Sequence, residues 1–218
     1  TFTKLREQAG MTNEELLGMQ KYSMATGGSL KENVESFQAS AKIMSFQKGV
    51  ALNTKKLMAD MSNVSNRTKL SIQGGATGLA KAAVAAKLMG GDLGKVADVA
   101  DQLLDFEQSI ESELSAELLL GKDINLEKAR QAALNNDLAT VAEEITKQAG
   151  TSAKFGEMNR IQQEVMAKAV GMTADQLADT LVEQEALKAS EPENDYLTLN
   201  ELEQKIKQFK TQIAIEKS

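Results

Sequence analysis

The chain has 218 residues, of which 42% are hydrophobic, and a formal net charge of −6. It contains neither cysteine nor histidine. Without cysteine it can form no disulfide and perform no thiol chemistry. Without histidine it lacks the side chain that most often serves as general base or metal ligand. The negative charge argues weakly against nucleic acid as a partner, and we expect no enzymatic activity, no cofactor and no metal.

The composition predicts an all-α protein. Good helix formers dominate, with one proline, two tyrosines and six phenylalanines in the whole chain, and no segment has the alternation typical of a strand. We expect seven or more helices in an elongated arrangement. The most apolar stretch, ATGLAKAAVAAKLMGG, is interrupted by Lys81 and Lys87 and is shorter than the roughly 20 apolar residues of a membrane span.

The first helix is predicted from the phrase AGMTNEELLGM, which begins at Ala9 and recurs in altered form as VGMTADQLADT from Val170. Thr12 and Thr173 suit the N-cap position, and a residue three positions later completes a capping box. Each phrase therefore predicts a corner between two helices, with a methionine and a leucine as hydrophobic staple. The residues of the two expected corners are Gly10, Met11, Thr12, Glu15, Leu16 and Gly171, Met172, Thr173, Gln176, Leu177.

A glycine pair follows the first helix, and Ser29 with Glu32 predicts the next helix start. Apolar residues then recur at spacings of three and four, which indicates one or two amphipathic helices. They are Val34, Phe37, Ala41, Met44, Leu57, Met61 and Val64. The glycines of QGGATG break this pattern, and a helix of small residues is expected from there to about Met89.

From Leu93 to Leu120 no helix breaker occurs, so one helix of roughly 40 Å is predicted. Its expected buried stripe is Leu93, Val96, Ala100, Leu103, Ile110, Leu114 and Leu118, with Glu107 as the one polar member. Gly121 should end this helix. Further on, Asn125 and Asn136 suit caps of two short helices, a helix is expected from Thr151 to Val170, and another over 174–189.

The C-terminal part begins with the polar stretch ASEPEND, which contains the only proline. Thr198 and Glu201 suit a capping box, and an apolar seam with coiled-coil spacing follows. Its residues are Leu199, Leu202, Ile206, Phe209 and Ile213. We expect this seam to associate with another copy of the chain or to fold back on the helix expected over 93–120.

These breaks suggest three parts. Residues 1–90 hold N-terminal helices with glycine breaks, 91–190 a long helix and a short-helix module, and 191–218 a polar linker and a C-terminal helix. Because the sequence begins at Thr1, we also expect it to be part of a longer protein.

Three motifs suggest a ligand and are better explained by structure. GATGLAKA resembles a phosphate-binding loop, but Ala80 replaces its second glycine and Ala82 its magnesium-binding hydroxyl. DINLE starts like a calcium loop but has Lys128 at the glycine position and Leu134 at the closing glutamate. The acidic residues Asp98, Asp101, Asp105 and Glu107 are expected to form a solvated face.

The segment QEVMAKAVGMTADQLADTL matches the spacing of a helix-turn-helix. Gln163, Ala167, Gly171, Met172, Thr173 and Leu177 occupy its characteristic positions. That pattern reflects how two helices meet at a sharp angle and does not require DNA. The second helix would present Asp175, Asp179 and Glu183 to the phosphates, with no basic residue before Lys188, so a structural corner is favoured and nucleic-acid binding is not expected.

Two blocks carry a family resemblance: FEQSIESELSAELLLGKDINLEKARQAALNNDLATVAEEITKQAG at 106–150 and MNRIQQEVMAKAVGMTADQLADTL at 158–181. They resemble a segment of the long helical tail tape measure proteins of bacteriophages. With the glycine-rich breaks at 73–78 and 90–91, the resemblance covers about two thirds of the chain.

The resemblance implies a structural virion protein inside the tail tube. It would set tail length, be coated by assembly chaperones in the host cytoplasm, contact tube and tail-tip proteins, and leave the tail ahead of the genome during ejection. A homo-oligomer is expected. Two alternatives stay open: a helical interaction module of another large assembly, and a DNA-binding regulator that uses the corner at 163–181.

Overall fold

The computed structural model describes residues 11–62 and 64–189, and these residues form twelve α-helices and no strand. The expectation of an all-α fold is therefore confirmed. The first helices are α2 (Asn13–Thr26), α3 (Leu30–Gln47), α4 (Thr54–Ser62), α5 (Asn66–Ser71), α6 (Gly75–Met89) and α7 (Leu93–Leu103). They are followed by α8 (Phe106–Leu120), α9 (Glu127–Leu134), α10 (Leu138–Ala149), α11 (Ser152–Glu157), α12 (Arg160–Ala169) and α13 (Ala174–Ala189).

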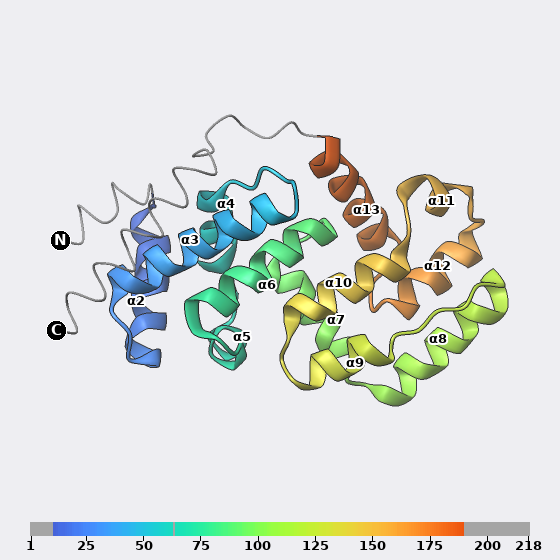
Figure 1. Cartoon of the computed structure of the whole chain (residues 1–218). Helices are drawn as coiled ribbons and strands as arrows, with labels where there is room; N and C mark the ends of the chain where they lie inside the picture. Colours follow the sequence, from blue (N-terminus) through green and yellow to red (C-terminus); the bar gives the residue numbers. More distant parts are fainter. Residues whose placement is uncertain (1–10, 63, 190–218) are drawn as a thin grey trace.

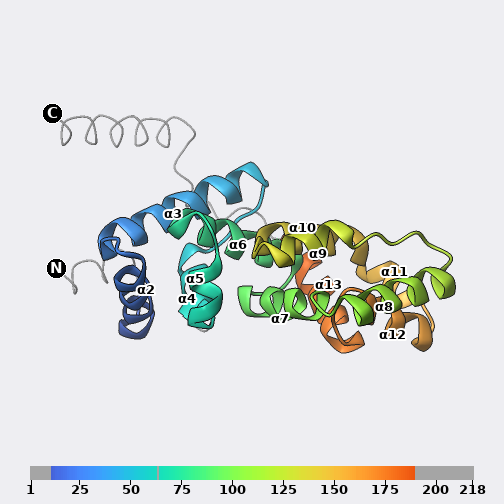
Figure 2. The same cartoon turned by 90° about the horizontal axis from the view of Figure 1, so that it is seen from below.

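The helices form an elongated body in both views, with α2 at one end and α8, α11 and α12 at the other (Figures 1 and 2). Helix α6 lies at its centre and packs along α3 on one side and α10 on the other. It is therefore in contact with helices on both sides of the boundary expected at residue 90.

The composition of α6 explains its central place. The side chains of α6 are small or apolar on nearly all sides of the helix, so the helix can be buried over most of its circumference. Because alanine has a short side chain, α3 and α10 can both approach its backbone closely. Its buried residues are Ala76, Leu79, Ala80, Ala82, Ala83, Val84, Ala85, Ala86 and Met89.

The expected helix over 93–120 is wrong: the chain breaks it into α7 and α8. Asp105 accounts for the break, because its carboxylate accepts a hydrogen bond from the backbone N–H of Gln108 at 3.2 Å and caps a new helix. The apolar residues of α7 are buried as expected. Those of α8 are not: Ile110, Leu114 and Leu118 are 45%, 54% and 85% exposed.

The expected helix from Thr151 to Val170 is also two helices. Thr151 caps the short α11, and Asn159 then caps α12 with a full capping box to Gln162. A side-chain acceptor three residues before a free amide is again the local cause.

The two asparagine caps are each displaced by one residue. The N-cap of α10 is Asp137, and Asn136 before it adopts a left-handed backbone with φ of +55°. The N-cap position of α9 is Leu126, while the side chain of Asn125 accepts from the N–H of Glu127.

The run expected as one or two helices over residues 30–64 is α3 and α4, with α5 following. The expected C-terminal cap (Thr198, Glu201) and the seam Leu199–Ile213 lie outside the described residues.

Candidate functional site

The first Gly-Met-Thr corner contains a reciprocal pair of hydrogen bonds. The hydroxyl of Thr12 accepts from the N–H of Glu15 at 3.2 Å, and the carboxylate of Glu15 accepts from the N–H of Thr12 at 2.7 Å. Met11 and Leu16 are both buried beside it, as a hydrophobic staple requires.

The second corner makes the same bonds. The hydroxyl of Thr173 accepts from the N–H of Gln176 at 3.2 Å, and the side-chain oxygen of Gln176 accepts from the N–H of Thr173 at 2.9 Å. Gly171 before it has φ of +75°, a conformation that favours glycine. The capping bonds are therefore the same in the two corners, while Gly10 of the first corner lies outside the described residues.

We expect Thr173→Ala to lower the free energy of unfolding by about 1 kcal/mol, because the amide of Gln176 loses its acceptor. Urea unfolding followed by circular dichroism measures the change. Thr173→Ser is the control, since it keeps the hydroxyl and should retain most of the stability. Equal stability of the alanine and serine variants would show that the cap contributes nothing.

The second corner packs directly on α7. A Cβ atom added at Gly171 would lie 3.3 Å from the Cβ of Gln102 and 3.4 Å from the carbonyl oxygen of Val99. Beside this contact lies a crevice of about 550 Å³, formed by α7, α8 and the corner. Asp98 and Asp101 line the crevice together with the capping residues Thr173 and Gln176.

This packing disfavours DNA binding by the segment that matches a helix-turn-helix. The start of α13, which would have to enter the major groove, faces α7 across a crevice whose charged lining residues are Asp98, Asp101 and Lys168. Its exposed charges over the first three turns are Asp175, Asp179 and Glu183, which repel phosphates.

We therefore expect no binding of mixed-sequence duplex DNA in a gel shift at low salt. Low salt favours electrostatic association most strongly, so the test is generous to the alternative. A shift at micromolar protein that disappears as salt is added would contradict the expectation.

Of the four acidic residues singled out in the sequence, only Asp98 and Asp101 lie together, in the crevice beside the second corner. Asp105 is a helix cap, while Asp98, Asp101 and Glu107 are exposed. In the described part of the chain no three acidic side chains are placed to hold a metal ion.

Helix α8 has a polar inner face that sequence periodicity did not predict. Small residues, Ser109, Ser112 and Ala116, are the ones it buries, and α12 packs along the helix. Two glutamates of α8 also hold the loop that follows it. Glu117 accepts from the N–H of Ile124 at 3.0 Å, and Glu113 from the N–H of Leu126 at 3.2 Å.

An ion pair that is largely shielded from solvent completes this inner face. The guanidinium of Arg130 on α9 donates to the second carboxylate oxygen of Glu113 and, at 3.2 Å, to the hydroxyl of Ser109. The side chains of Arg130 and Glu113 are only 11% and 13% exposed. The polar network therefore fixes which face of α8 turns inward.

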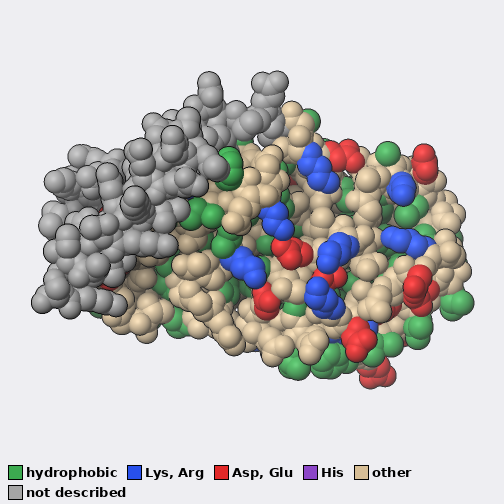
Figure 3. All heavy atoms as spheres, viewed as in Figure 1, with side chains coloured by type: hydrophobic (Ala, Val, Ile, Leu, Met, Phe, Trp, Pro, Cys, Tyr) green, Lys and Arg blue, Asp and Glu red, His purple; other side chains and the backbone are tan. Residues whose placement is uncertain are grey.

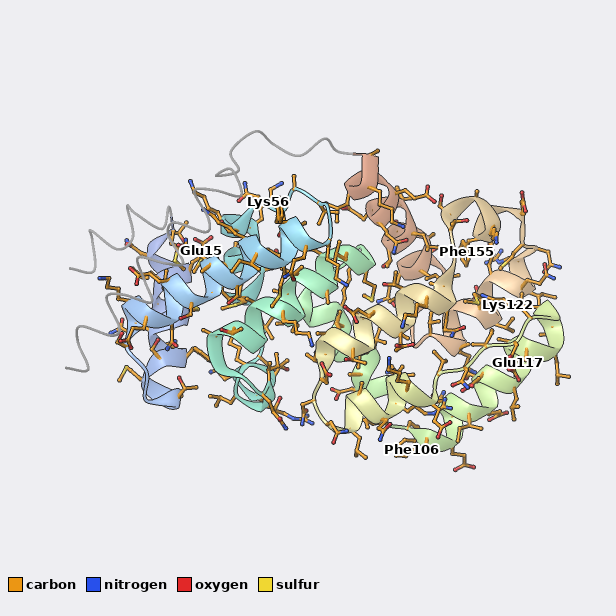
Figure 4. All side chains as sticks on the ribbon, in the orientation of Figure 1. Glu15, Lys56, Phe106, Glu117, Lys122 and Phe155 are labelled. Carbon is orange, nitrogen blue, oxygen red and sulfur yellow. The ribbon has the colours of Figure 1, made fainter. Side chains whose placement is uncertain are left out.

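The outer face of α8 is apolar and open to solvent. Phe106, Ile110, Leu114 and Leu118 follow one another at intervals of four and are all exposed by 45% or more. Phe106 lies at the lower edge of the molecule, at the start of α8 (Figure 4). We define these four residues as the α8 stripe. It is the largest helical run of exposed apolar side chains in the described residues and the candidate functional surface.

A second charged cluster joins α9 and α10. The carboxylate of Glu144, which is buried, accepts from Lys128 at 2.6 Å and from Lys147 at 2.7 Å. These two hydrogen bonds hold the pKa of Glu144 below its ordinary value of 4.5.

The lowered pKa gives a pH dependence. A carboxyl group whose pKa is lower in the folded state stabilises the fold above its unfolded pKa, and this contribution is lost as the pH falls through the folded value. We expect the unfolding free-energy difference between the unsubstituted protein and Glu144→Gln to be fully present at neutral pH and to shrink as the pH falls toward and below 4.5. Urea unfolding over a pH series measures it. A difference that does not change with acidification would contradict this role of Glu144.

The chain matches no protein-family model, no curated protein and no solved structure. In the described residues no helix is both long and apolar enough to cross a lipid bilayer.

Proposed function

We propose that the chain is a structural segment of a bacteriophage tail tape measure protein. It would lie in the lumen of the tail tube, contribute to tail length, contact tube and tip proteins, and leave with the genome. The resemblance of 106–150 and 158–181 to that family supports the proposal. So does one structural observation, the local capping of the helices.

Ten of the described helices are capped by a side chain that accepts from the backbone N–H three residues later. The caps are Thr12, Ser29, Asn53, Ser65, Asp92, Asp105, Asp137, Thr151, Asn159 and Thr173. Each cap is complete within a few residues of sequence, so a helix start can form again before any tertiary contact does.

This property suits a chain that must be extended in a narrow tube and released. Extension separates helices that pack on one another, but it leaves contacts between residues three apart in place. The absence of cysteine means that no disulfide opposes extension. A protein that depended on distant polar contacts at its helix ends would re-form more slowly, because closing long loops costs more chain entropy.

The decisive experiment is an in-frame deletion of residues 11–189 from the parent gene. Tails should shorten by about 1.5 Å for each residue removed, the rise of an α-helix, as measured by electron microscopy. Replacing the segment with an unrelated helical sequence of equal length is the control and should restore the length. Unchanged tails after deletion would contradict the proposal.

The α8 stripe also fits the second reading, a helical interaction module of another large assembly. An exposed apolar run on consecutive helical turns is typical of a protein contact surface. The two readings differ in the deletion experiment, because only a tape measure couples its residue number to tail length.

A further inference from the structure

We propose that the α8 stripe binds the C-terminal segment Leu199–Ile213 of a second copy of this chain. The α8 of each copy would receive the segment of the other. This pairing concerns how two copies associate, and it does not depend on the tape-measure proposal.

Polar contacts hold α8 with its large apolar side chains outward. Ser109, Ser112 and Ala116 are buried, and the pair Glu113–Arg130 locks this orientation. The helix cannot turn its larger side chains inward without burying polar groups apart from their partners. Hydrophobic side chains line the lower right edge of the space-filling view, where α8 runs (Figure 3).

Helix α8 and the C-terminal segment match in length and in apolar pattern. Helix α8 has 15 residues, and Leu199–Ile213 spans the same number, so each would be about 22 Å long as a helix. The sequence of the segment predicts one apolar stripe at spacings of three and four. Two single-striped helices of equal length can bury each other along their whole length.

The charges beside the two stripes also favour this pairing. Helix α8 carries four glutamates and no basic residue, and Glu107 and Glu111 are exposed beside the stripe. The segment carries Glu201 and Glu203 near its start and Lys205, Lys207 and Lys210 over the rest, so its basic side chains outnumber its acidic ones by one. Opposite charges flanking an apolar contact favour this pair over two α8 helices or two C-terminal segments packed together.

The position of α13 favours a second copy over the same chain. Helix α13 ends at Ala189 at the upper edge of the molecule, while α8 runs along the lower edge, with α7 and α10 between them (Figure 1). Only residues 190–198 would connect the two, and they would have to pass around the body. Reciprocal exchange between two copies avoids this path and gives a closed two-fold dimer.

Sedimentation of the full chain tests the surface. We expect a mass of twice 23.5 kDa, and Leu118→Glu should raise the dimer dissociation constant at least about tenfold, because the charge would enter an apolar contact. Leu118 is 85% exposed, so the fold should be unaffected. Val182→Glu, on the exposed side of α13, is the matched control and should leave the dimer intact. If the unsubstituted chain were monomeric at high concentration, the proposal would be overturned.

Cross-linking tests whether the C-terminal segment is what binds the α8 stripe. Because the chain has no native cysteine, only the introduced cysteines can react. Chains carrying Leu118→Cys are mixed with chains carrying a cysteine at one end of the segment, Leu199→Cys or Ile213→Cys, so that both directions of the segment along α8 are tested, and treated with a flexible bis-maleimide. We expect a covalent dimer from one of the two mixtures and little from any variant alone. The double variant that combines the two cysteines of that mixture should likewise give a covalent dimer. A double variant that cross-links only within one chain would overturn the second-copy assignment. A dimer with no cross-link between these positions would overturn the pairing, whatever the tail-length experiment gives.

Discussion

Gly90→Ala should lower the free energy of unfolding by about 3 kcal/mol, a large share of the roughly 5–15 kcal/mol that stabilises most domains. Gly90 ends α6 with φ of +95°, where an L side chain is strained. A Cβ atom there would also lie 1.9 Å from the carbonyl oxygen of Thr180 and 2.9 Å from the nitrogen of Gln184. Helix α13 would therefore have to move away from the end of α6, which adds an overpacking cost of about 1–3 kcal/mol.

Gly121→Ala is the matched control. Gly121 also ends a helix in the left-handed conformation, with φ of +61°, but a Cβ atom there would meet nothing within 4 Å. It should cost only the backbone strain, about 1 kcal/mol. Urea unfolding of both variants separates strain from close packing. Equal losses in the two variants would show that α13 does not approach α6 as closely as the structure places it.

The close approach at Gly90 illustrates what sequence alone could not give. The glycine pair at 90–91 predicted a helix end, and α6 does end there. Nothing in the sequence indicated that α13, some ninety residues later, would press on that glycine. Gln184 donates to the carbonyl oxygen of Leu88 at 3.3 Å, so the contact depends on two helices that meet only in the folded chain.

Helix caps can be predicted from the sequence, because each depends on residues three positions apart. The two wrong predictions, single helices over 93–120 and 151–170, follow from apolar periodicity without regard to the caps inside these runs. Thr12 and Thr173 each have an acceptor partner three residues on, and their corners follow from that spacing. Asp105 with Gln108 and Asn159 with Gln162 have the same spacing and begin α8 and α12. The apolar periodicity continued through both positions and suggested uninterrupted helices, although a good cap can start a new helix within such a run.

The sequence pattern does not predict which side of α8 faces the core. The helix has a stripe of small residues and a stripe of large apolar residues, and periodicity cannot say which one turns inward. The choice depends on partners elsewhere in the chain: Arg130 on α9 and the amides of the loop that Glu113 and Glu117 bind. Ile110, Leu114 and Leu118, which belong to the stripe predicted from the sequence, consequently lie on the surface, and Phe106, which was not part of that prediction, lies there with them.

We expect Glu113→Ala to lower the free energy of unfolding by about 3 kcal/mol. The substitution leaves the buried guanidinium of Arg130 without its carboxylate and the amide of Leu126 without its acceptor. Removing one partner of a buried ion pair costs about 3–5 kcal/mol, mostly because the other charge stays buried and unpaired. The small exposed fraction that both side chains retain places the expected loss at the lower end of that range.

Two further variants test whether the loss comes from the unpaired charge of Arg130. Glu35→Ala breaks the exposed pair Lys31–Glu35, whose side chains are 71% and 42% exposed, and should cost at most about 1 kcal/mol. The double variant Glu113→Leu/Arg130→Met removes both charges and should recover much of the stability lost in Glu113→Ala, because no buried charge is left alone. If Glu113→Ala cost no more than Glu35→Ala, the pair would not fix the orientation of α8. If the double variant were as unstable as the single one, the loss would come from the freed amide of Leu126 and the contacts of α8 with its loop.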